Sequence, residues 1–299
     1  MAVMVTDGVA TAPAAEGAAR LLRNLLRRAE IARSAGAYDA LSAVLVERAG
    51  FDCVWASSFT ISASACLPDL SLLTMTDYLQ AAAPMVAACS VPVLADCDTG
   101  FGGSLNVAHT VRSYERTGVA GICIEDKNFP KTNSFVEHGQ ELAPVDEFAR
   151  KIEVAKETQT DPDFVVVART EALICGRSVD EALERGERYV DAGADALLVH
   201  SKRPDPSEIT SFLRHWEGRA PVVVVPTTYH GWTAGEASAA GAAMVIYANH
   251  ALRAAVRAIA ETLRRIWEDG CSSEVQPQIA SVDEIFELVR LDDWLALDR

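Results

Sequence analysis

The sequence has little positive charge for its length, and this shortfall excludes one class of partner. It contains 27 lysine and arginine residues against 42 aspartate and glutamate residues, a formal net charge of −15. Nucleic-acid binding depends on a basic face that contacts phosphates, so we expect no nucleic-acid partner. A small anionic substrate is compatible with this charge only where a metal ion or a local group of lysine and arginine side chains receives it.

Several motifs and segment types are absent. None of the seven cysteines forms a C-x-x-C pair, and scattered thiols of this kind are typical of a reduced, cytosolic protein. No apolar run approaches the ~20 residues that a membrane span needs. The first twenty residues contain no continuous apolar stretch like that of a signal peptide. We therefore expect a cytoplasmic protein without a membrane segment.

What the sequence does contain is a series of short apolar runs separated by amphipathic stretches. The later runs are apolar on both faces, as in parallel strands that are covered on both sides. A glycine precedes four of the runs, where a left-handed residue ends a helix cheaply; these glycines are Gly50, Gly118, Gly193 and Gly241. The eight runs lie at residues 30–36, 51–57, 91–98, 120–126, 163–170, 194–201, 221–227 and 242–249.

Eight strand-then-helix units in about 250 residues predict an α/β fold of the (β/α)8 or TIM-barrel type. A doubly wound open sheet is the structural alternative, but it usually carries a glycine-rich first turn, and the sequence has no G-x-G-x-x-G motif. We expect a partly mobile N-terminal extension at 1–24, the barrel at 25–270, and a C-terminal helical tail at 271–299. Within that tail, two short helical patterns occur at 281–290 and 292–297.

Polar residues follow five consecutive predicted strands, all at the same end. They fall at 55–58, 96–98, 125–127, 169–171 and 200–202. In a TIM barrel, catalytic groups collect at the C-terminal ends of the strands. Each residue alone also has an ordinary structural interpretation as a helix cap, an ion pair or a core side chain. Gathering so many charges at one rim is costly unless they pair with one another or bind a metal and a charged ligand.

The residue types at this rim favour one kind of metal and one kind of substrate. Asp96, Asp98 and Glu125 offer hard oxygen ligands, which suit Mg²⁺, with Mn²⁺ as a substitute. A zinc site would require histidine or cysteine ligands, and the rim offers only His200. Arg169 provides a planar fork of donors for a carboxylate or phosphate. Together these residues indicate a small, multiply anionic substrate.

Five stretches resemble the phosphoenolpyruvate mutase/isocitrate lyase superfamily, and the resemblance extends from about residue 36 to about residue 268. They are LADCDTGFG (94–102), EDKNFPKTNS (125–134), DPDFVVVARTEA (161–172), GADALLVHSK (193–202) and IYANH (246–250). The EDK-x5-NS pattern is the specific one and resembles the mutase branch, whereas D-x-D-T-G-[FY]-G indicates only the superfamily. The resemblance implies a TIM barrel whose last helix is exchanged between the subunits of a dimer or tetramer.

The resemblance also implies roles for individual residues. It places Mg²⁺ on Asp96, mostly through water, with Asp98 and Glu125 completing the surroundings of the metal. The residues implied to line the substrate pocket are Trp55, Ser57, Ser58, Phe59 and Arg169. The residues implied to act in catalysis are Asp69, Lys131, Asn133, Ser134, Arg169 and His200, of which Lys131, Asn133 and Ser134 lie on a mobile loop that closes over the site.

The reaction implied is the movement of the phosphoryl group of phosphoenolpyruvate from oxygen to carbon, which gives phosphonopyruvate. Lyases of the superfamily carry a cysteine proton donor on the mobile loop, in a K-[KR]-C-G-H pattern. The corresponding residues here, KNFPKTNSF at 127–135, contain no cysteine. A carbon–carbon lyase is therefore disfavoured.

Three alternatives to the mutase interpretation stay open at this point. The nearest is phosphonopyruvate hydrolase, which resembles the mutase but has threonine in place of the loop asparagine. Asn133 favours the mutase, whereas Ser57-Ser58-Phe59 resembles the hydrolase branch more than the Gly-Ser-Gly-Leu of many mutases. The others are a carboxyphosphonoenolpyruvate mutase and a non-enzymatic sensor of a phosphorylated metabolite, although a sensor need not keep the full set of charged residues.

Overall fold

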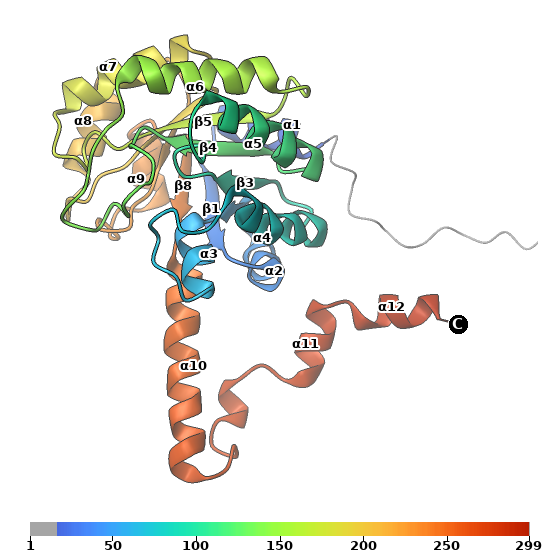
Figure 1. Cartoon of the computed structure of the whole chain (residues 1–299). Coiled ribbons are helices and arrows are strands. Elements are labelled where there is room, and N and C mark those ends of the chain that lie inside the picture. The colour runs from blue at the N-terminus through green and yellow to red at the C-terminus, as the bar shows by residue number, and fades with distance from the viewer. Residues whose placement is uncertain (1–16, 299) are drawn as a thin grey trace, which may run out of the picture.

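A computed structural model describes residues 17–298 and shows parallel strands that close into one barrel (Figure 1). Each strand pairs with the next along the chain, and the last pairs with the first. The strands are β1 (Ala32–Ala37), β2 (Cys53–Ala56), β3 (Val93–Asp96), β4 (Gly121–Glu125), β5 (Val165–Thr170), β6 (Ala196–Val199), β7 (Val222–Val224) and β8 (Met244–Tyr247). The predicted TIM barrel is confirmed, and the open sheet is wrong.

Helices alternate with the strands, and those between successive strands lie around the outside of the barrel (Figure 1). The helices of the chain are α1 (Ala18–Arg27), α2 (Ala40–Arg48), α3 (Ser58–Ser64), α4 (Met75–Ala88), α5 (Ser104–Thr117), α6 (Val145–Thr158), α7 (Val179–Asp191), α8 (Ser207–Trp216), α9 (Ala234–Ala239), α10 (His250–Asp269), α11 (Val282–Leu288) and α12 (Leu291–Leu297). Among residues 17–298, no helix combines the length and apolar character needed to cross a bilayer.

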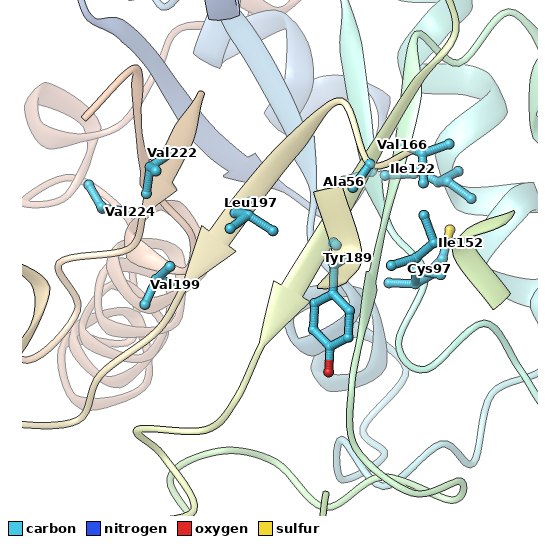
Figure 2. Close-up of a cluster of buried hydrophobic side chains, with 14 of the residues drawn as sticks. Ala56, Cys97, Ile122, Ile152, Val166, Tyr189, Leu197, Val199, Val222 and Val224 are labelled. Carbon is cyan, nitrogen blue, oxygen red and sulfur yellow. The ribbon is translucent and has the colours of Figure 1, made fainter. Parts of the chain in front are cut away.

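Successive strand residues alternate between two separate cores, because side chains in a strand point to opposite faces. On β5, Val166 and Ala168 face outward to the helices, whereas Val165 and Val167 fill the barrel interior. Figure 2 shows part of the outer cluster, in which Tyr189 of α7 lies close to the strands. This alternation decides which residues reach the rim of the barrel.

Glycine is required where β1 approaches the end of β8. A Cβ atom on Gly36 would lie 1.9 Å from the carbonyl oxygen of Ala248, so no larger residue fits this part of the barrel wall. The glycines that were predicted to end helices have positive φ angles of 84° to 103°, as expected; they are Gly50, Gly118, Gly193 and Gly241.

The N-terminal end of the barrel is closed by α1. Leu22 and Leu26 are buried together with the residues of the barrel interior. The boundary that was expected at residue 24, between a mobile extension and the barrel, falls inside this helix. Residues 1–16 of the expected extension lie outside the described part of the chain. Helix α1 is built into the barrel because its apolar face covers side chains that would otherwise face water.

Helix α10 leaves the barrel instead of packing on it. None of its residues is buried, and Figure 1 shows it projecting away from the strands, with the chain turning back at its end so that α11 and α12 lie to one side of it. The two tail helices occupy the segments where helical patterns were predicted. Four large apolar side chains along α10 are 58% to 86% exposed; they are Val256, Ile259, Leu263 and Trp267.

Candidate active site

The alternation inside the barrel produces a polar rim. On β5 the inward series runs through Val165 and Val167, and its next member is Arg169. On β3 the inward residue Leu94 is followed by Asp96 in the same way. The same two-residue step leads to Ser57, Glu125 and His200 from the buried residues before them. The rim is therefore the continuation of the barrel core, with charged and polar side chains in place of apolar ones.

A long loop covers this rim. It runs between β4 and α6, and a single bridge between Lys127 and Leu142 joins its two ends; we call residues 127–142 the lid. The lid and the strand ends enclose one pocket. The predicted site residues that line the pocket are Trp55, Ser57, Ser58, Phe59, Asp69, Asp96, Lys131, Asn133, Ser134, Arg169 and His200.

Two predicted metal residues, Asp98 and Glu125, lie behind the pocket lining and contact cationic side chains. A carboxylate oxygen of Asp98 is 2.7 Å from Nζ of Lys131, which also lies 3.1 Å from Asp69. Glu125 is 3.3 Å from Nε of Arg169. Because these cations lie between the acids, no group of three or more His, Cys, Asp or Glu side chains in residues 17–298 converges as a metal-ligand cluster. The resemblance implies contact with the metal mostly through water, so the roles of Asp96, Asp98 and Glu125 stay a prediction.

The site nevertheless fits a hydrated divalent cation. Both carboxylate oxygens of Glu125 and Oδ1 of Asp98 are buried, and they contact cationic side chains as ion pairs but form no hydrogen bond. Burial raises the pKa of Asp98 to about 6, although the neighbouring ammonium of Lys131 opposes the shift. Asp96 lines the pocket itself, and its Oδ2 accepts a 2.8 Å hydrogen bond from the hydroxyl of Ser58. A Mg²⁺ ion that keeps several waters needs only one or two direct carboxylates.

Arg169 and His200 lie side by side at the pocket wall. Nη2 of Arg169 is 3.1 Å from both Oγ of Ser134 and Nδ1 of His200. Burial lowers the pKa of His200 even though Glu171 opposes this shift, so the ring is neutral at pH 7. Nε2 of His200 is buried without a hydrogen-bond partner, which leaves it available to a ligand in the pocket.

The contacts of Nδ1 decide what Nε2 of His200 offers to that ligand. Nδ1 lies 3.0 Å from Oε1 of Glu171 and 3.1 Å from Nη2 of Arg169. A guanidinium only donates and an ionised carboxylate only accepts, so Nδ1 hydrogen-bonds to one of the two at a time. When Nδ1 accepts from Arg169, the ring proton is on Nε2, where it can be donated to an oxyanion. A negatively charged ligand therefore favours this tautomer.

Asn133 attaches the lid to the opposite side of the pocket. Its Nδ2 donates a 2.7 Å hydrogen bond to Oδ2 of Asp69, and its Oδ1 accepts one of 3.0 Å from the backbone N–H of Phe135. Both ends of the amide are thus used. The ring of Phe135 packs edge-on against His200, with the ring centroids 5.8 Å apart.

Sequence reasoning missed several residues of the site. Phe135, Thr227 and Asn249 line the pocket, and Glu171 lies directly behind it against Arg169 and His200. Glu171 was placed among the polar residues at the rim but was given no role, although it is the next inward position after Arg169. Asn249 belongs to the IYANH stretch, which was noted without a role. Phe135 carries no signal of its own, since the conformation of the lid alone brings it to His200.

Comparisons with known proteins agree with this architecture. The family model described as phosphoenolpyruvate phosphomutase matches residues 22–267. The phosphoenolpyruvate phosphomutase of Tetrahymena pyriformis is 43% identical over 93% of this chain and 93% of its own length. The phosphonopyruvate hydrolase of Variovorax sp. is 44% identical over 89% of this chain and 93% of its own. Overall identity therefore does not separate these two activities.

Solved structures give the same picture. A phosphoenolpyruvate phosphomutase from Streptomyces platensis subsp. rosaceus superimposes with a TM-score of 0.92 at 51% identity, covering 94% of this chain and 98% of its own. A phosphonopyruvate hydrolase in complex with oxalate and Mg²⁺ has a TM-score of 0.89 at 41% identity, covering 94% and 97%. The chain belongs to the phosphoenolpyruvate phosphomutase family, within the phosphoenolpyruvate mutase/isocitrate lyase superfamily.

Proposed function

We propose that this protein is a cytoplasmic phosphoenolpyruvate mutase that interconverts phosphoenolpyruvate and phosphonopyruvate. The observation that carries the proposal is Asn133, the residue type that resembles the mutase branch, hydrogen-bonded to Asp69 where the lid meets the pocket. The seven cysteines are free thiols, which supports a reducing compartment.

The forward reaction breaks the bond between phosphorus and the enol oxygen and forms a bond between phosphorus and C3. No proton is gained or lost overall, which suits a lid without a cysteine proton donor. In this proposal Arg169 binds the carboxylate or the phosphoryl group through its free donors, and His200 donates from Nε2 to an oxyanion. Lys131, which hydrogen-bonds Ser58 at 3.0 Å, adds positive charge from the lid.

The lid supports such a reaction by keeping water out. Phosphoryl transfer through a loose transition state produces an electrophile that water can capture. Asn133 and Ser134 hold the lid to opposite sides of the pocket through Asp69 and Arg169, so closure excludes solvent while the phosphoryl group moves.

Mg²⁺, or Mn²⁺ in its place, is the proposed cofactor. Asp96 would hold it, with Asp98 and Glu125 around it, and these are the acids whose buried oxygens lack hydrogen bonds or face the pocket. When bound, the cation supplies positive charge that stabilises a developing oxyanion.

Phosphonopyruvate hydrolase is the second candidate, favoured by the Ser57-Ser58-Phe59 sequence in the pocket wall. The discriminating experiment is ³¹P NMR of phosphonopyruvate incubated with the protein and Mg²⁺. Appearance of phosphoenolpyruvate supports the mutase, and inorganic phosphate supports the hydrolase. An unchanged spectrum would contradict both and leave a binding protein or a mutase for carboxyphosphonoenolpyruvate, which is then tested with that substrate.

We also propose that the active protein is a homo-oligomer, a dimer or tetramer, joined through α10. The outer face of α10 carries four exposed apolar side chains at helical spacing, and none of its residues is buried. An apolar groove lies next to it, where a last barrel helix would pack; its lining includes Leu45, Val46, Phe51 and Tyr247. Helix α10 of a second copy would fill this groove, which amounts to an exchange of the last helix.

Light scattering at micromolar protein concentration tests the assembly. We expect a mass of two or four chains for the wild type and a monomer for a Leu263→Glu variant, because a charge on the buried face opposes association. The matched control is Arg257→Glu on the same helix. A monomeric wild type would rule the proposal out.

A further inference from the structure

We propose that Glu171 is a positioning residue that couples closure of the lid to the orientation of Arg169 and His200. The inference rests on the proposed substrate-binding role of those two residues, but it does not depend on whether phosphoenolpyruvate or phosphate is the product.

Glu171 is held rigidly at the C-terminal end of β5. It is fully buried, and its backbone N–H donates a 2.8 Å hydrogen bond to Oδ1 of Asp126. Oδ2 of Asp126 accepts in turn from the hydroxyls of Tyr189 at 2.8 Å and Thr170 at 3.0 Å. The backbone of Glu171 is therefore fixed by side chains in the outer layer of the barrel.

The two carboxylate oxygens of Glu171 serve different parts of the site. Oε1 accepts from Nε of Arg169 at 2.7 Å and lies 3.0 Å from Nδ1 of His200. Oε2 lies 3.2 Å from Nζ of Lys127 and accepts a hydrogen bond from the hydroxyl of Ser134. One oxygen thus contacts the pair that faces the pocket, and the other contacts the lid.

The carboxylate remains ionised in spite of its burial. Burial opposes the charge, but the neighbouring cations Arg169 and Lys127, together with a hydrogen bond to His200, outweigh it and hold the pKa of Glu171 well below its ordinary value. An ionised carboxylate that loses a buried hydrogen-bond donor is destabilised. Opening the lid removes the Ser134 hydroxyl both from Glu171 and from Nη2 of Arg169.

This arrangement makes the closed lid and the oriented Arg169 mutually stabilising. The lid closes most favourably when Arg169 aligns the carboxylate of Glu171 through Oε1. Arg169 is in turn oriented most firmly when the hydroxyl of Ser134 donates to Oε2 of Glu171. The Glu171→Gln substitution keeps the size of the side chain, but its amide cannot accept at both ends. Either the pocket pair or the lid then loses its acceptor.

Limited proteolysis measures this coupling without relying on turnover. Trypsin can cleave after Lys127 and Lys131, and both side chains are buried while the lid is closed. We expect Mg²⁺ with oxalate to slow lid cleavage in the wild type, and Glu171→Gln to restore cleavage by about tenfold or more. Glu141→Gln, an exposed glutamate of the same lid, is the matched control and should behave like the wild type.

A double-mutant cycle with Ser134→Ala completes the test and covers the case in which Glu171→Gln does not fold. Each single variant should lower kcat/KM by about tenfold or more, and the double variant by little more than the larger single effect, because both break one contact. Lid cleavage of Ser134→Ala should also rise. The inference would be overturned if the lid of both single variants resisted trypsin as well as the wild type does. It would also be overturned if the losses of kcat/KM in the two single variants multiplied in the double variant. A wild type that forms no phosphoenolpyruvate would contradict the proposed function alone, since the cleavage result does not depend on it.

Discussion

The two ends of this barrel are built on opposite principles. At the N-terminal end, α1 closes the interior with Leu22 and Leu26. Its one charged side chain that reaches inward, Arg23, donates to Asp195 at 2.9 Å and to the carbonyl oxygens of Pro162 and Phe164 at 3.1 and 3.2 Å. The charge of Arg23 is thus paired within the chain, and this end serves stability.

At the C-terminal end, several buried polar atoms form no hydrogen bond. Both carboxylate oxygens of Glu125 and Oδ1 of Asp69 contact cationic side chains only as ion pairs, at 3.1 to 3.7 Å, and Nε2 of His200 has no hydrogen-bond partner. A protein selected only for stability would not leave such groups unsatisfied, because each one costs free energy. This difference between the two ends supports the proposal that a metal ion and an anionic ligand bind at the C-terminal rim.

The largest effect is expected when one aspartate is removed from each end of the barrel and the two variants are compared. Asp96→Ala should lower kcat on the order of 10³-fold, roughly 4 kcal/mol, because the proposed metal site loses its carboxylate in the pocket. The Tm of this variant should not fall, because the substitution removes one of several neighbouring negative charges and so relieves their repulsion. Asp195→Ala, which removes a partner of Arg23, should lower Tm and keep kcat. Turnover by ³¹P NMR and calorimetry measure both, and a full rate after EDTA treatment would refute the metal site.

The next effect concerns a single charge at the rim. Arg169→Lys should lower kcat/KM on the order of 10²-fold, roughly 2.7 kcal/mol, because an ammonium cannot replace a planar fork that also contacts Ser134 and Glu171. The equivalent change at the other end, Arg23→Lys, should leave kcat/KM unchanged. A loss below about threefold at Arg169 would make it a structural residue.

A smaller effect is expected at the N-terminal end of the barrel, where a substitution should change the free energy of unfolding but not the activity. Leu22→Ala should lower the free energy of unfolding by about 2 kcal/mol, because it removes a fully buried side chain from the barrel interior. Leu21→Ala on the exposed face of the same helix is the control and should have little effect. Chemical denaturation measures the stability. If Leu22→Ala changed kcat/KM while stability stayed the same, the division of roles between the ends would be wrong.

The smallest effect distinguishes the two candidate activities at the rim. Threonine at position 133 has one hydroxyl and cannot both donate to Asp69 and accept from Phe135 with the reach of an amide. We expect Asn133→Thr and Asn133→Ala to slow phosphoenolpyruvate formation and to raise the share of inorganic phosphate by about threefold, a shift of under 1 kcal/mol.

Product partition measured by ³¹P NMR tests this expectation. Asn128→Thr, the same substitution at an exposed position of the lid, should keep the wild-type ratio. An unchanged ratio in both Asn133 variants would mean that this residue does not control access of water, and the hydrolase interpretation would gain support.

The local sequence pattern was sufficient to predict the strands and the polar rim of the barrel. The apolar runs, the helix-ending glycines and the polar residues after each run are features of a few neighbouring residues, and alternation along a strand carries them to one end of a barrel. Residues that follow from this pattern, such as Asp96 and Arg169, were therefore identified without coordinates. Glu171 follows from the same alternation and was placed at the rim, but no role was assigned to it.

The sequence by itself determined the fold, the end of the barrel that carries the site, and the residue types that meet there, because these depend on periodicity and on strand order. Only the tertiary structure decided which charges pair. Lys131 lies between Asp69 and Asp98, Glu171 joins the lid to Arg169, and α10 stands away from its own barrel. Such contacts join segments far apart in the chain, and the loop conformations that bring them together leave no local pattern in the sequence.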